Sequence, residues 1–357
     1  PANTWPDGQM EWYLNGVLHR GNDEPAVIYP SGEMEWYKNG LKHRENGPAS
    51  ISKEITVWYR NGVRHRDDGL PALIKTDGTQ KWYVNGYLHR ENAPAVLGVD
   101  REKWYKNGKL HRDGGPAVVG KNGTYIWYRN GVIHRDGDLP AELNSCGIIK
   151  WYKNGVQHRE GDKPASVSII EGMADIKYEW FWHGKRHRKN GPAIVCYSGY
   201  EAWYKNGVLH REGYPAVSSP DGLRKWVING KSHRIDGPAE IWSSGAKSWM
   251  IKGKLHREGA PAFEYGDGGY IWYQRGKMHR IDGPAWYFAR DNKCEWHVNG
   301  VLQTRTQVLR RIKRYNLPSL PENANIVFAP EKPKLKKLKM WYPNSPAEVI
   351  PFYSKKD

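Results

Sequence analysis

The segment WYKNGKLHRDGGPAV at residues 104–118 brings together side chains that could perform acid–base chemistry. His111 stands next to Arg112, and Asp113 follows directly. A histidine oriented by a carboxylate can act as a general base, and an arginine can stabilise developing negative charge. Taken alone, the segment has the composition of an active site, so a catalytic role for His111 has to be weighed against a structural one.

The same arrangement recurs along the chain at a nearly constant interval. The consensus is close to D-G-x-x-x-W-Y-x-N-G-x-x-H-R-x-x-G-P-A, and twelve of the 14 histidines directly precede an arginine. A catalytic site needs one constellation with special surroundings, so twelve copies indicate a structural role and we expect no catalysis. A motif tryptophan marks thirteen units, with steps of 22 to 24 residues and one step of 29: Trp12, Trp36, Trp58, Trp82, Trp104, Trp127, Trp151, Trp180, Trp203, Trp226, Trp249, Trp272 and Trp296.

Each part of the repeat has a backbone interpretation. Asn-Gly between strand-forming residues predicts a two-residue hairpin turn, and Asp-Gly, as at 77–78, predicts a second turn. Gly-Pro-Ala predicts a bend, because proline donates no hydrogen bond to a ladder. In the unit quoted above, the predicted structural positions are Trp104, Tyr105, Asn107, Gly108, His111, Arg112, Gly115 and Pro116.

These signals predict an all-β fold over residues 1–302, an elongated antiparallel β-meander of about thirteen hairpin repeats. Between the two turns we expect a strand of about six residues, such as LRKWVI before Asn229, with Trp and its neighbour on opposite faces. The 29-residue step contains SIIEGMADIKYEWFWHG, which we interpret as a lengthened loop. Stability should come from packing between neighbouring repeats.

The charge and the cysteines indicate which classes of partner and which cellular compartment suit the chain. The formal net charge is +17, which suits nucleic acid, an anionic membrane or an acidic protein surface. Cys146, Cys196 and Cys294 lie far apart, as is typical of a reducing compartment. No apolar run approaches the roughly 18 residues of a membrane span, and the first residues lack the apolar core of a signal peptide. We therefore expect a soluble, intracellular, cytoplasmic protein.

On these residues the repeats resemble MORN (membrane occupation and recognition nexus) repeats. They are similar to a divergent variant, W-Y-x-N-G-x-x-H-R-x-x-G-P-A, of large DNA virus and phage proteins, and the resemblance spans about residues 5–302. The chain has Gly-Pro-Ala where the usual signature has a G-x-G step, and it adds the regular His-Arg pair. The resemblance implies one β-hairpin per repeat in an elongated sheet, and scaffolding or protein interaction more often than catalysis.

The His-Arg pairs admit several interpretations. We expect each arginine to stack on an aromatic ring while its fork bonds a carboxylate or a loop carbonyl, in preference to forming an exposed anion-binding stripe. We expect each histidine to be neutral and bonded to the backbone; the alternative is a pH sensor. Equivalent histidines about 10 Å apart could not share a metal ion, so we expect neither metal nor cofactor. Ten pairs are followed within two residues by an acid, namely Glu45, Asp67, Glu91, Asp113, Asp136, Glu160, Glu212, Asp236, Glu258 and Asp282.

The repeat stops after Leu302. Residues 303–317 have apolar Val308, Leu309, Ile312 and Tyr315 at helical spacing, with Thr304 or Thr306 available as N-cap, and predict an amphipathic helix that caps the sheet edge. Residues 318–357 form a basic, proline-rich, aromatic tail. The candidate partner-binding residues are Arg310, Arg311, Lys313, Arg314, Lys334, Lys336, Lys337, Lys339, Trp341 and Tyr342.

The sequence thus predicts a non-enzymatic repeat scaffold that mediates protein–protein interaction, as a structural component of a larger, viral assembly. The alternative is nucleic-acid or anionic-surface binding through the basic tail, which predicts steep salt dependence. A membrane is disfavoured as partner, and no small-molecule substrate is expected. An enzymatic hypothesis would place a unique cluster in the inserted unit at 166–184, yet that unit has no nucleophile and base at recognisable spacing.

Overall fold

The computed structural model describes residues 2–170, 172, 175–320 and 325–331. The chain forms two compact units, residues 1–256 and 257–357, which we call unit 1 and unit 2. Both are built from antiparallel strands, and the helix α1 (Arg305–Tyr315) lies in unit 2. The predicted all-β fold of hairpin repeats with a short C-terminal helix is therefore confirmed. Among the described residues, no helix is long and apolar enough to cross a lipid bilayer.

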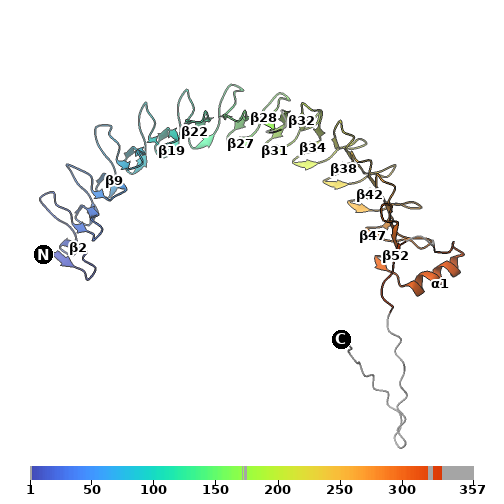
Figure 1. Ribbon diagram of the computed structural model, residues 1–357. Coiled ribbons are helices and arrows are strands. Elements are labelled where there is room, and N and C mark those ends of the chain that lie inside the picture. Colours follow the sequence, from blue (N-terminus) through green and yellow to red (C-terminus); the bar gives the residue numbers. More distant parts are fainter. Residues whose placement is uncertain (1, 171, 173–174, 321–324, 332–357) are drawn as a thin grey trace, which may run out of the picture. The chain divides into compact units, whose positions relative to one another are not determined.

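Each repeat contributes two ladder strands and one small hairpin (Figure 1). In a representative repeat, β12 (Leu73–Lys75) and β13 (Gln80–Lys81) pair with Leu73 opposite Lys81, and β13 pairs onward with β16 (Val96–Leu97) of the next repeat. Between these ladder strands, β14 (Tyr83–Val84) and β15 (Tyr87–Leu88) form a separate two-stranded sheet. The ladder therefore joins neighbouring repeats, and each small hairpin stands beside it.

The predicted six-residue strand is divided at its tryptophan. LRKWVI becomes β37 (Arg224–Lys225) and β38 (Val227–Ile228), with Trp226 between them. The backbone N–H of Trp226 donates to the carbonyl of Ala239, in the Pro-Ala pair that closes its unit, at 2.8 Å, whereas its carbonyl accepts from the N–H of His233 at 2.9 Å. Because the two bonds hold Trp226 to different partners, the chain leaves the ladder at this residue and enters the small hairpin.

The core is thin and repeats along the sheet. The alanine of each Pro-Ala pair is fully buried, as Ala72 and Ala95 illustrate. Around Ala72, the side chains of Val57, Leu73 and Tyr83 form one buried cluster. A small side chain at the alanine position allows the ladder and the loop to approach closely, because interiors pack without space to spare. The core is therefore made between repeats and not inside one.

The inserted residues lengthen a hairpin. β28 (Ser166–Ile170) and β29 (Asp175–Glu179) pair over five residues each, whereas the lengthened segment was predicted as a loop. The Asp175 carboxylate accepts from the backbone N–H of Ser198 at 2.9 Å and from its hydroxyl at 2.7 Å. The prediction was wrong because strand-forming residues alternate with polar ones in SVSII and DIKYE, so both segments continue the ladder register.

Unit 2 ends with a helix and one parallel strand. Thr304 caps α1, and it forms a capping box with Gln307, so the predicted N-cap is confirmed. β52 (Asn325–Val327) pairs in parallel with β49 (Lys293–Glu295). The strand bonded to this sheet edge therefore comes from the segment predicted as tail and not from the helix.

The helix packs by fewer residues than its sequence pattern indicates. Val308 is fully buried, Ile312 is half-buried, and Leu309 and Tyr315 are exposed, so the apolar spacing overstates the packed face. The helix therefore exposes apolar side chains among its basic ones.

Candidate functional site in the His-Arg row

In eleven of the His-Arg pairs, the arginine stacks on the tryptophan of its own repeat. In the repeat quoted at the start, Cζ of Arg112 lies 3.9 Å from the ring centroid of Trp104, and Nη1 donates to the carbonyl of Pro116 at 3.3 Å. A Cβ added to Gly115 would lie 3.0 Å from Cζ of Arg112, which explains why glycine precedes the proline. The predicted stacking, with a loop carbonyl as acceptor, is confirmed. Equivalent stacks occur at Arg20, Arg44, Arg66, Arg90, Arg135, Arg159, Arg188, Arg211, Arg234 and Arg280.

In eleven of the His-Arg pairs, the histidine bonds to the backbone of the following repeat. The backbone N–H of Asn130 donates to Nδ1 of His111 at 3.0 Å, and that of Asn107 donates to Nδ1 of His89 at 3.1 Å. Nε2 of His111 lies 3.0 Å from Oδ1 of Asp113. An acceptor Nδ1 and a donor Nε2 define the neutral imidazole. The predicted backbone bond is confirmed, and its partner in the next repeat leaves Nδ1 no lone pair for proton abstraction.

The remaining consensus positions complete the joint between hairpins. Tyr105 pairs with Leu110 in the small hairpin, and burial raises the pKa of the tyrosine hydroxyl. Asn107 and Gly108 adopt φ of 50° and 78°, the turn geometry that Asn-Gly predicts. The N–H of Gly108 donates to the carbonyl of Leu88 in the preceding hairpin at 2.8 Å. Each turn is thus bonded to the hairpin before it.

The acids that follow the His-Arg pairs mostly contact other residues than the arginine. Glu160 receives a bond from Lys153 at 2.6 Å, and Asp136 receives one from Arg129 at 3.1 Å. Arg234 does reach its own Asp236, at 3.1 Å. Arg280 likewise bonds Asp282, at 2.9 Å, so the acid that follows the pair supplies the expected carboxylate in a minority of the described pairs.

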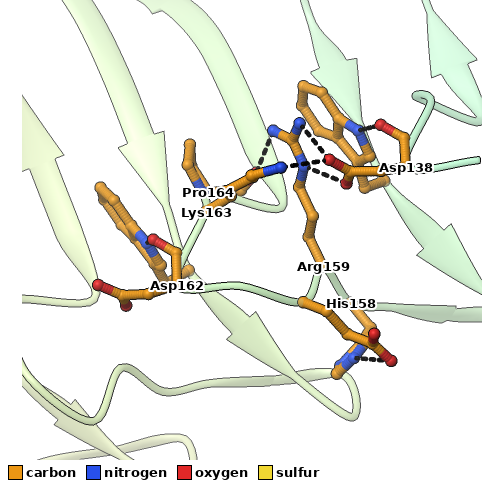
Figure 2. A network of polar contacts seen from close by, with 9 residues as sticks. Asp138, His158, Arg159, Asp162, Lys163 and Pro164 are labelled. Carbon is orange, nitrogen blue, oxygen red and sulfur yellow. Dashed lines mark hydrogen bonds and ion pairs between the residues drawn. The ribbon is translucent and has the colours of Figure 1, made fainter.

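A second group of carboxylates, which lie in longer loops and were not predicted, accepts hydrogen bonds from the arginine guanidinium of the next repeat. Asp138 accepts from Nε of Arg159 in the next repeat at 2.7 Å and from Lys163 at 2.7 Å, as Figure 2 shows. These bonds lower the pKa of Asp138 to about 2. The carbonyl of Asp138 accepts from Nε1 of Trp151 at 3.0 Å. One residue therefore holds both side chains of the next Trp-Arg stack.

A sequence signal for these aspartates exists. Where four residues, in place of three, separate the arginine from Pro-Ala, the third loop residue accepts from the next tryptophan through its carbonyl; it is an aspartate with positive φ at Asp23, Asp138 and Asp162, and Gly69 in the fourth such loop. Asp23 bonds Arg44 and Asp162 bonds Arg188 in the same way. After a three-residue loop, Nε1 of Trp203 has no hydrogen-bond partner among the described residues. Loop length thus predicts which joints carry the added bonds.

We expect Asp138→Asn to weaken the joint between its repeat and the next. The substitution removes the charge that Arg159 and Lys163 share, and partial exposure limits the loss in free energy of unfolding to about 1 kcal/mol. Urea denaturation at neutral pH measures it. Asp113→Asn is the matched control, since Asp113 contacts His111 of its own repeat and should cost less. Equal losses in the two variants would contradict the assignment.

A cleft lies between two successive His-Arg loops. It has a volume of about 560 Å³ and is lined by residues that include His134, Asp136, Leu139, Tyr152 and Glu160. His134 already accepts from the N–H of Asn154 and lies 2.9 Å from Asp136. Among the described residues there is also no group of three or more histidine, cysteine, aspartate or glutamate side chains that could hold a metal ion. The polar groups of the cleft are therefore used in the joint.

The inserted repeat brings two histidines together. The ring of His158 lies 5.0 Å from that of His183 and 4.6 Å from that of Trp182. His183 occupies the turn position that is asparagine in most repeats, and its backbone N–H donates to Nδ1 of His158 at 3.3 Å. Burial, and secondly the neighbouring His183, lower the pKa of His158, although Glu160 acts in the opposite direction.

We expect the imidazole of His158 to titrate at lower pH in the folded chain than in the urea-unfolded chain. Because the folded pKa is the lower one, the stability contributed by neutral His158 is complete above the unfolded value of about 6.5 and is lost as pH falls through the folded value. NMR titration of the ring protons measures both midpoints, and His158→Asn assigns the signal. A folded midpoint at or above the unfolded one would contradict the buried acceptor geometry.

The candidate partner-binding residues fall into two groups. Arg310, Lys313 and Arg314 are exposed on α1, and Arg311 is half-buried there. Lys334, Lys336, Lys337, Lys339, Trp341 and Tyr342 lie outside the described residues. The exposed basic residues of α1 lie beside Leu309 and Tyr315, which are exposed as well.

Comparison with known proteins identifies no family for this chain. Neither the scan against protein-family models nor the search of curated proteins gives a match to the chain. The functional argument therefore rests on the joints between repeats and on the surfaces that those joints leave exposed.

Proposed function

We propose that the chain is a non-enzymatic repeat scaffold of the MORN-like kind that mediates protein–protein interaction. The observation that carries the proposal is the bond that Nδ1 of a repeat's histidine accepts from the next repeat's backbone N–H, which recurs in eleven repeats, as between His111 and Asn130. A histidine used in this way fixes the spacing of repeats and cannot serve as a general base without breaking the joint. A regular array of fixed spacing suits the presentation of an extended surface.

The likeness of the repeat to the large DNA virus and phage variant extends the proposal. On that basis the chain is a structural component of a larger viral assembly, in the cytoplasm of the infected cell or in the virion. This extension has only the sequence resemblance in its support, whereas the scaffold proposal also draws on the joints.

The experiment is purification of the tagged full-length chain from its native source after nuclease treatment. We expect a protein partner to be retained through a wash at high salt, because an apolar or shape-complementary contact is little weakened by screening. Cross-linking followed by mass spectrometry should place that partner on the repeats. Retention of no protein would overturn the proposal.

The second candidate is binding of nucleic acid or another anionic surface through the C-terminal region. It is favoured by the exposed positive charge of Arg310, Lys313 and Arg314 on one short helix. Neutralising all three to glutamine in the full-length chain should lower the affinity for a DNA duplex and flatten its salt dependence. Binding that is unchanged by the triple substitution would remove these helix residues from the candidate interface.

A further inference from the structure

Unit 1 exposes an apolar side chain at the same place in most of its small hairpins. The residue that follows the Asn-Gly turn is one strand position beyond the tip, and it points away from the ladder core. We call these residues the tip stripe. Its apolar members are between 41% and 64% exposed, and they are Val17, Leu41, Val63, Tyr87, Val132, Val156 and Val208.

Neighbouring members of the tip stripe are linked through the turn glycines. A Cβ added to Gly62 would lie 3.3 Å from Cδ2 of Leu41, and one added to Gly86 would lie 3.5 Å from Cβ of Val63. Each side chain therefore packs on one side against the glycine of the next repeat and remains open on the other. The exposed apolar residues follow one another over four successive repeats, from Val17 to Tyr87, and Lys109 and Lys185 occupy the same position further along. An exposed apolar surface of this kind is typical of a binding site.

A basic residue stands beside most members of the stripe. In the small hairpins, Lys38 pairs with Leu41, Arg60 with Val63, Arg129 with Val132, Lys153 with Val156 and Lys205 with Val208. In later hairpins of unit 1 the order is reversed, with Ile228 opposite Lys231 and Ile251 opposite Lys254. Neither of these two positions carries an acid in any small hairpin of unit 1. The surface is therefore apolar and cationic together.

Part of this positive charge is available to a partner. Lys38, Arg60, Arg129 and Lys153 are ion-paired with Glu45, Asp67, Asp136 and Glu160. Among the basic residues of these hairpins, Lys185, Lys205 and Lys231 have no ion pair within the described residues. Nucleic-acid phosphates would contact the basic residues and leave the apolar side chains of the stripe unused. A lipid membrane is also disfavoured, because membrane-surface segments usually insert Trp, Phe or Leu, whereas this stripe has mainly valine. The mixture instead matches a protein segment that carries carboxylates and apolar side chains.

The repeat spacing restricts the form of that segment. Two ladder strands about 4.8 Å apart set the step between tips to about 10 Å. A polyproline II chain rises about 3.1 Å per residue with three residues per turn, so it presents the same face about every 9.3 Å. We propose that the tip stripe binds an acidic, extended protein segment with an apolar side chain at every third residue. This inference rests on the proposed scaffold function and names its partner class.

The test uses the full-length chain and a fluorescein-labelled peptide of about six Glu-Leu-Pro triplets, a sequence that favours polyproline II. We expect saturable binding by fluorescence anisotropy. A peptide of the same composition with irregular leucine spacing, and one with lysine in place of glutamate, should each bind at least about tenfold more weakly. Equal affinity for the irregular peptide would overturn the proposed register.

The matched variants locate the site. The triple substitution Val63→Glu, Val132→Glu and Val156→Glu should weaken peptide binding at least about tenfold, whereas Ile235→Glu, at an 83% exposed position off the stripe, should leave it unchanged. Circular dichroism checks the fold of each variant. If the triple variant does not fold, Leu41→Ser with Tyr87→Ser removes two exposed members without adding charge, and the same loss is expected.

The remaining outcomes separate this inference from the scaffold proposal. Binding of a DNA duplex or of phosphatidylserine vesicles that the triple substitution abolishes, without peptide binding, would overturn the inference in favour of that partner. A native protein partner that the triple variant retains would also overturn it and leave the scaffold proposal standing. Absence of any retained protein partner would overturn the scaffold proposal itself.

Discussion

Replacing Trp82 by alanine should lower the free energy of unfolding of unit 1 by about 3–5 kcal/mol. Trp82 is 5% exposed, its ring lies 3.8 Å from Cζ of Arg90, and Nε1 donates to the carbonyl of Gly69 at 2.7 Å. The substitution leaves a cavity, removes the stacking surface of an arginine and leaves the Gly69 carbonyl without this donor. Because neighbouring repeats stabilise one another, the loss should extend to both adjacent joints.

Two measurements check this prediction. Urea denaturation followed by circular dichroism gives the overall loss, and hydrogen–deuterium exchange should show faster exchange in β12, β13 and β16 than in distant repeats. Trp5→Ala is the control, because Trp5 is 51% exposed and the expected loss is below about 1 kcal/mol. Similar losses for the two variants would show that the Trp-Arg stack does not hold the joint.

Val308→Asp should be the most damaging single change in unit 2, with an expected loss of about 3 kcal/mol or more in the free energy of unfolding. The Val308 side chain is fully buried, and it is the only residue of α1 that is. A carboxylate at this position would have to lose its water without a partner, so the helix should separate from the sheet.

The neighbouring residue provides the control for the helix. Leu309 is 46% exposed, so Leu309→Asp keeps the new charge in water and should cost little. Hydrogen–deuterium exchange of α1 and of β52 distinguishes the two variants, since β52 follows the helix in the chain and pairs with β49. If both variants left exchange in β52 unchanged, the helix and the edge strand would be independent of each other.

Several features of the fold could be predicted because their causes are local. Asn107 and Gly108 adopt positive φ, and only a few residue types tolerate that conformation, so the sequence itself indicates the turn. Thr304 and Gln307 satisfy the first backbone donors of α1 at a spacing that can be read directly. Because the motif recurs at a fixed period, the prediction of one hairpin could be extended to an array of hairpins.

Other features could not be predicted from spacing because they depend on partners in the next repeat. The bond from Asn130 to His111 and the bonds from Arg159 and Lys163 to Asp138 join residues about one repeat apart, and a consensus describes positions without stating which repeat supplies the partner. The division of the strand at Trp226 also depends on residues distant from it in sequence, since its N–H bonds to Ala239 and its carbonyl to His233.

By itself, then, the sequence determined the turns, the repeat period and the helix, all of which follow from the chemistry of neighbouring residues. The tertiary structure decided that the His-Arg pairs form joints between repeats, that β52 pairs at the edge with β49, and that most residues after the hairpin turns of unit 1 are exposed apolar side chains. Those outcomes depend on register between repeats, which is set by backbone hydrogen bonds and packing across the ladder and has no signature in a single repeat.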